Sequence, residues 1–173
     1  NHDGQNQSLM DLHVFMPGNA HRPDTTYHDA YGNGRRIGWN HRSDNLSRGV
    51  QDVDHTAPPG KTIPIENISF PDIKKMPEGV YICKVHNWQA RNTNTSGFKA
   101  EIELTGDLYQ YEYPSATKHH QWVTIAEVTL KNGQFTIAHK IPPTSVMSKE
   151  IWGTKTNDFT KVSMVTISPN YWG

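Results

Sequence analysis

Apolar and polar residues alternate along the segment LMDLHVFMP, residues 9–17. Met10, Leu12 and Val14 occupy every second position, and Asp11 and His13 stand between them. Successive side chains of a β-strand point to opposite faces, so an apolar residue at every second position predicts a half-buried strand. The same period places Asp11 and His13 on one common face of that strand.

Similar short segments follow along the rest of the chain, separated by residues that are typical of turns. The alternation is cleanest in the segment 97–106, where it directs Phe98, Ala100, Ile102 and Leu104 inward. In the segment VQDVD it places Val50, Asp52 and Asp54 on one face, and Gln51 and Val53 on the other. The predicted strand segments after the first are 35–42, 50–54, 66–70, 79–88, 97–106, 107–113, 121–130, 134–140 and 161–168.

One pair of these segments carries a strong turn signal. Asn132 and Gly133 lie between two alternating segments, and an Asn-Gly pair in that position predicts a β-hairpin. A helical period is absent, except for one turn at 145–152. We therefore expect an all-β, antiparallel β-sandwich, jelly-roll-like, with roughly eight to ten strands, long loops and little helix.

Length and composition limit the classes of protein to which this chain can belong. The 173 residues are most simply one domain, 1–173, with residues 1–8 frayed and the long polar segment 17–36 either mobile or functional. Seventeen basic residues balance seventeen acidic ones, so no overall field attracts nucleic acid. The single Cys83 excludes an intrachain disulfide and a cysteine-based zinc site. No apolar run approaches the roughly 18 residues of a membrane span.

The segment QDVDH, residues 51–55, carries two aspartates two positions apart. Carboxylates at alternate positions of a strand that ends in a loop can converge on a hard cation such as calcium, which prefers oxygen ligands. Asp11 and Glu66 complete an acidic cluster with Asp52 and Asp54 if their strands lie side by side. The alternative is that Asp52 and Asp54 cap turns through backbone hydrogen bonds.

The histidines offer a second kind of metal site. Imidazole suits zinc and other transition metals, and four of the ten histidines lie in or just after predicted strands. The alternative is that these side chains are solvated or hydrogen-bonded without a metal. The four histidines are His13, His41, His55 and His86.

Six motifs in order, DLHVFMP, IGWNH, QDVDH, PIENISFP, PEGVYICKVHNW and GFKAEIEL, resemble the YfaP-like β-sandwich domains of bacteria and their phages. The resemblance covers roughly residues 9–140. It implies an all-β module of a larger surface or phage protein, without an established catalytic activity. The family has a second acid where this chain has Leu9, so one expected ligand is missing. The positions that match the family's acidic and amide residues are Asp11, Asp52, Asp54, Glu66 and Asn67.

The tail SMVTISPNYWG is similar to a segment that continues in phage-type relatives, so we expect Gly173 to be a cut end.

The remaining candidates concern binding surfaces and catalysis. Trp88, Tyr27 and Tyr31 are predicted to contact a protein or carbohydrate ligand, whereas Trp39 and Trp122 are expected in the core between the sheets. Hydrolase, metalloprotease and nucleotide-binding motifs are absent from the sequence.

We therefore expect a non-catalytic recognition or structural module, extracytoplasmic or virion-associated, with calcium as its cation and zinc as the alternative. The alternative functions are a structural component of a phage virion or larger surface assembly, and a metal-dependent hydrolase that uses a histidine and acid cluster.

Overall fold

The computed structural model describes residues 9–17, 36–53, 65–89, 97–148, 150–151, 154–155 and 163–169. Strands dominate these residues, and the one helix among them is the 3-10 turn η2, Ile73–Lys75. None of the described helices is long or apolar enough to cross a membrane. The strands are β1 Leu9–Phe15, β2 Arg36–Ile37, β3 Val50–Val53, β4 Glu66–Phe70, β5 Gly79–Gln89, β6 Phe98–Leu104, β7 Asp107–Tyr113, β8 Trp122–Lys131, β9 Gln134–His139, β10 Pro143–Ser148, β11 Glu150–Ile151, β12 Thr154–Lys155 and β13 Ser163–Pro169.

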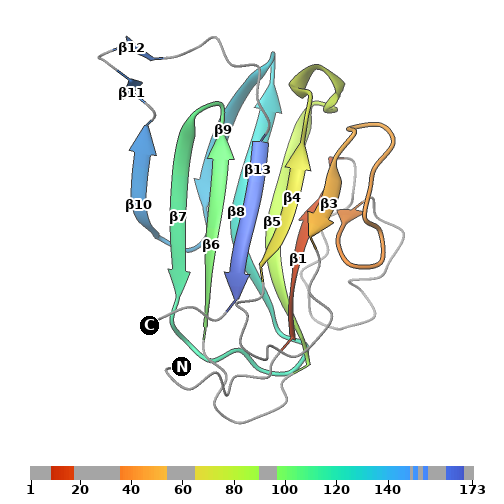
Figure 1. Ribbon diagram of the computed structural model, residues 1–173, viewed down its shortest axis with the longest axis vertical. Coiled ribbons are helices and arrows are strands. Elements are labelled where there is room, and N and C mark those ends of the chain that lie inside the picture. The colour runs from red at the N-terminus through yellow and green to blue at the C-terminus, as the bar shows by residue number, and fades with distance from the viewer. Residues whose placement is uncertain are drawn as a thin grey trace.

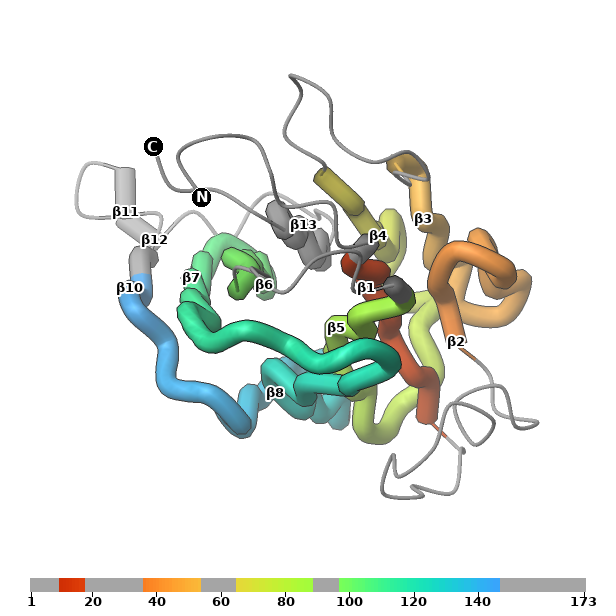
Figure 2. Tube along the Cα trace, turned by 90° about the horizontal axis from the view of Figure 1, so that it is seen from below, coloured from red at the N-terminus to blue at the C-terminus, as the bar shows by residue number. Residues whose placement is uncertain are grey.

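The strands form two large antiparallel sheets. One has five strands in the order β2-β1-β5-β8-β9, and the other has six in the order β10-β7-β6-β13-β4-β3. Figures 1 and 2 show the six-stranded sheet lying over the five-stranded one. The prediction of an all-β, antiparallel protein with little helix is confirmed, and the jelly-roll-like connectivity stays a prediction.

The apolar core draws side chains from both sheets. Strand β6 alternates as its sequence predicts, with Phe98, Ala100, Ile102 and Leu104 buried and the residues between them partly exposed. These side chains belong to the same apolar cluster as residues of β1, β5 and β8 in the other sheet. Burial of large apolar side chains on the facing sides of the sheets is therefore the main force that holds the layers together.

The predicted hairpin joins β8 to β9. Asn132 has φ of 51° and Gly133 has φ of 72°, the left-handed pair that a two-residue turn of this kind requires. The turn is also fixed from outside, because the Asn132 N–H donates to Glu78 Oε1 at 2.6 Å. This interaction links the hairpin to the residues that precede β5.

Two local expectations were wrong. The segment 145–152, where a helical turn was expected, contains most of β10, which pairs with β7. In β3 the register shifts between Gln51 and Val53, so Gln51 is buried while Val50, Asp52 and Val53 are all exposed. Strict alternation fails there because a β-bulge adds a residue to one strand and rotates the side chains that follow.

Hydrogen bonds of side chains join the two sheets at two places. Strand β2 pairs with β1 only at Val14 and Phe15, so the Leu12 N–H lies beyond the paired region. That N–H donates to Glu66 Oε2 of the other sheet at 2.5 Å. On the opposite side, the Tyr111 hydroxyl of β7 lies 2.8 Å from His139 Nδ1 of β9. The buried Glu66 side chain thus has a structural role at the place where β1 needs an acceptor.

Replacing Glu66 with alanine should therefore destabilise the fold. The substitution removes the carboxylate acceptor from a buried backbone N–H, and hydrogen bonds to charged groups contribute about 1.5–3 kcal/mol. The free energy of unfolding, measured with urea, should fall by about that amount. The matched control is Glu103→Ala on β6, where the side chain is partly exposed, with an expected change within about 0.5 kcal/mol. Equal losses for the two variants would contradict the role of Glu66.

Candidate metal centre

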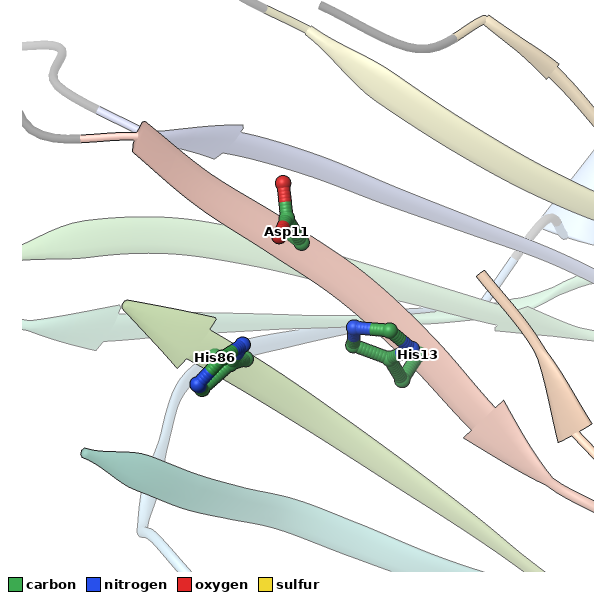
Figure 3. Close-up of side chains that lie close together, drawn as sticks. All are labelled: Asp11, His13 and His86. Atoms are coloured by element: carbon green, nitrogen blue, oxygen red, sulfur yellow. The ribbon is translucent and has the colours of Figure 1, made fainter. Parts of the chain in front are cut away.

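Three potential metal ligands meet on the outer face of the five-stranded sheet. Asp11 and His13 project from β1, and His86 projects from β5 directly opposite Asp11. One ligand atom from each residue lies within 4.8 Å of the other two. Figure 3 shows the three side chains on the same side of the two strands. All are buried, with exposed fractions of 7% for Asp11, 1% for His13 and 0% for His86.

The burial of this outer face comes from aromatic rings and from a close backbone approach. Trp122 of β8 pairs with His86 across the sheet and stacks on it, with centroids 4.2 Å apart and 13° between the planes. The same indole lies 4.9 Å from the His13 ring. Gly38, after β2, comes so near that a Cβ there would lie 2.1 Å from His13 Nδ1. Trp122 therefore covers part of both imidazoles, and the backbone at Gly38 also covers that of His13.

His120 adds a further ring at the end of β5. Its imidazole lies parallel to that of His86, with centroids 5.8 Å apart and 15° between the planes. The His120 N–H donates to the carbonyl of Asn87 at 2.8 Å, which fixes the turn against β5. Its φ of 59° lies in the left-handed region, a conformation that histidine adopts only where the surroundings hold it.

His13 has polar atoms that the described residues do not satisfy. Neither Nδ1 nor Nε2 of this side chain has a hydrogen-bond partner among the described residues. Buried polar side-chain atoms are nearly always hydrogen-bonded, and an unsatisfied one costs about 1–3 kcal/mol. A ring in this state beside a second imidazole and a carboxylate fits a metal ligand well, because coordination uses the nitrogen lone pair.

The electrostatics favour the neutral form of both imidazoles. Burial, with smaller effects of the Arg36 charge and of His86, holds the pKa of His13 well below its usual value. Burial, followed by His120, Arg36 and His119, lowers the pKa of His86 to about 3. Neutral imidazole is the form that binds metal, so no proton has to be displaced from either ring at neutral pH.

The donor atoms of these three side chains are of the kind that transition metals bind. Two imidazole nitrogens and one carboxylate oxygen suit zinc and other transition metals, which they hold at about 2.0–2.2 Å. Small side-chain rotations would bring the three atoms to that distance from one ion. Three protein ligands also leave at least one coordination position for another group.

The structure brings together some residues of the two predicted metal sites and places others apart from them. Asp11, His13 and His86 come together, whereas His41 is exposed in the turn after Gly38. Asp52 is exposed on β3 and accepts a hydrogen bond from Asn67 Nδ2 at 2.7 Å. Neither Asp52 nor Glu66 joins the group around Asp11 among the described residues. Asp54 and His55 lie outside the described residues, so the four-acid calcium set stays a prediction.

The predicted ligand-binding aromatics are only partly described. Trp88, at the end of β5, is half-buried and lies 5.6 Å from the Trp39 ring. Trp39 is 36% exposed in the turn after β2, so its expected place between the sheets was wrong. Trp122 also lies on the outer face rather than in the core. Tyr27 and Tyr31 lie outside the described residues.

Comparison of the chain with protein-family models, curated proteins and solved structures finds no match.

Acid should destabilise the metal-free protein through the two imidazoles. Their pKa values are lowered in the folded state, so the unfolded chain binds more protons once the pH falls below about 6.5. The stability is complete above that pH and is lost as the pH falls toward about 3, the pKa of His86.

The measurement is urea unfolding at pH 7 and pH 5 in the presence of a chelator. When the pH falls from 7 to 5, the free energy of unfolding should decrease by about 2 kcal/mol for each of the two histidines. His86→Gln removes one titrating ring. The decrease in its unfolding free energy over the same pH interval should therefore be smaller by the contribution of one histidine. Equal losses in the parent protein and in His86→Gln would show that the ring does not control the acid response.

Gly38→Ala should disturb the centre by steric exclusion. The added Cβ would fall on the His13 ring, which is buried and must move, and such overpacking costs about 1–3 kcal/mol. The measurement is a double-mutant cycle of unfolding free energies with His13→Ala. Alanine at position 38 should cost much less once the imidazole is gone. Additive losses would contradict a direct contact between the two positions.

Proposed function

We propose that this protein is a metal-binding β-sheet module in which a divalent transition metal, zinc first among the candidates, fastens β1 to β5. The observation that carries the proposal is the buried His13 ring, both of whose nitrogens have no hydrogen-bond partner among the described residues, beside His86 and Asp11. An ion bound there joins two strands that are already neighbours. It therefore stabilises the sheet in addition to the backbone hydrogen bonds.

Burial of the ligands favours a structural role for the metal. Side chains that are 0–7% exposed leave little room for a substrate larger than a small ion to reach the metal. A non-catalytic recognition or structural module follows, as expected for a YfaP-like domain in an extracytoplasmic or virion-associated setting. Its protein or carbohydrate partner would meet an aromatic surface, defined by Trp39 and Trp88, whose rings lie 5.6 Å apart.

The donor atoms favour zinc over calcium at this group. Calcium prefers six to eight oxygen ligands, whereas two of the three donors in this group are nitrogens. Zinc accepts both kinds of donor. We therefore expect zinc to bind at Asp11, His13 and His86. Binding of calcium at the four-acid set is the alternative result that the experiment can detect.

Metal content and thermal stability test the proposal together. Purified protein should bind one equivalent of zinc by elemental analysis, and at a free zinc concentration of 100 times Kd the stabilisation should be about 2.7 kcal/mol. His13→Gln and His86→Gln should each abolish the zinc-dependent rise in Tm, because each removes one of three ligands. His41→Gln is the matched control, since this exposed histidine lies outside the group, and should behave as the parent protein does.

Two results would contradict the proposal. If zinc raises the Tm of His13→Gln and His86→Gln as much as that of the parent protein, the ion binds elsewhere. If calcium but not zinc raises the Tm, and Asp52→Ala abolishes the effect, the four-acid set is the site. Hydrolysis of ester or phosphoester substrates by the zinc-loaded protein, lost in His86→Gln, would instead support the hydrolase.

A further inference from the structure

The indole of Trp122 brings a second kind of unsatisfied atom to the metal centre. Its ring stacks on His86 and lies 4.9 Å from His13, so it contacts both imidazole ligands. The Nε1–H of Trp122 is buried and has no acceptor among the described residues. An indole nitrogen can only donate, so neither a metal ion nor a cationic side chain can satisfy it. It requires a ligand atom that carries a lone pair.

The charges around the centre point to the same kind of ligand. A divalent ion held by two neutral imidazoles and the Asp11 carboxylate keeps one net positive charge. Arg36 on β2 is 7% exposed and lies close enough that its charge contributes to the lowered pKa of both His13 and His86. Its Nη2 donates to Asn40 Oδ1 at 2.8 Å, which holds the guanidinium beside the turn that covers His13. Buried charge of one sign is costly unless an opposite charge accompanies it.

We propose that the metal at Asp11, His13 and His86 also binds a small carboxylate or inorganic oxyanion, which accepts a hydrogen bond from the Trp122 Nε1–H. The anion occupies the coordination position that three protein ligands leave open. This inference rests on the proposed metal site, and it adds the chemical class of a second ligand.

Cobalt(II) and formate are suitable probes. Cobalt occupies sites built for zinc and has visible absorption bands that report a change of ligand. Cobalt binding is measured first, by titration calorimetry, for each variant. Sodium formate is then added to the fully loaded protein, with sodium perchlorate at equal ionic strength as the reference for non-specific salt effects.

Formate should change the cobalt spectrum saturably, and perchlorate should not. Trp122→Phe keeps an aromatic ring against His86 but removes the donor, so formate should bind about tenfold more weakly to the loaded variant. Tyr113→Phe is the matched control, because it also removes one donor from an aromatic side chain, and this ring belongs to the six-stranded sheet, where it stacks on Phe98; its formate affinity should equal that of the parent protein.

Nuclear magnetic resonance of the zinc-loaded parent protein keeps the test decisive if Trp122→Phe fails to fold. One of the five tryptophan indole N–H signals should move on addition of formate. Cobalt binding without a formate response, or a response that is the same in Trp122→Phe, would overturn the anion site and leave the metal site standing. Absence of cobalt and zinc binding would overturn both.

Discussion

Strand β1 is buried on both of its faces, and much of the structure around it follows from that constraint. Its inner face carries Met10, Leu12 and Val14 into the apolar core, as an ordinary half-buried strand would. Its outer face carries Asp11 and His13, which are also buried. A polar face that is removed from water has to find partners inside the protein, because an unsatisfied buried group costs a substantial share of a domain's total stability. The surroundings of β1 therefore have to supply those partners or a ligand that replaces them.

The surroundings of β1 supply partners for its backbone but not for all of its side chains. Glu66 accepts the hydrogen bond of the Leu12 N–H where β2 no longer pairs with β1. The Leu12 N–H is therefore satisfied on the side where the two sheets meet. At the imidazole of His13, Trp122 lies against the ring and Gly38 closes over it, and neither ring nitrogen has a hydrogen-bond partner among the described residues. An ion at this position would bind one of these nitrogens through its lone pair.

Much of the fold could be predicted from the sequence, because alternation is a local property. The inward set of β6 and the turn at Asn132 and Gly133 follow directly from residue order. The bulge in β3 could not be predicted, because it depends on pairing with β4. The single face shared by Asp11 and His13 also followed from their spacing. Whether that face meets water or protein is decided by segments distant in sequence, so its burial was not predictable.

The residues that form the site could likewise not be predicted without knowing which distant segments pair. His86 faces Asp11 because β1 and β5 pair in one particular register, and a shift of one residue would turn its ring to the other face. His41 carried an equally good local signal but lies in an exposed turn. Trp122 and Arg36 gave no metal signal, since neither is an ordinary ligand. They could be connected with the site only after the sheet order was known.

The unsatisfied atoms at the centre are of two kinds, and no single ligand satisfies both. A lone pair of the His13 imidazole needs an acceptor of electrons, which a metal ion would provide, whereas the Trp122 N–H needs a donor of electrons. A metal alone would meet the first need and raise the buried positive charge. An anion alone would meet the second but would lie beside the Asp11 carboxylate. Each of the two proposed ligands would therefore reduce the cost of binding the other, which is the physical reason for proposing a cation and an anion together.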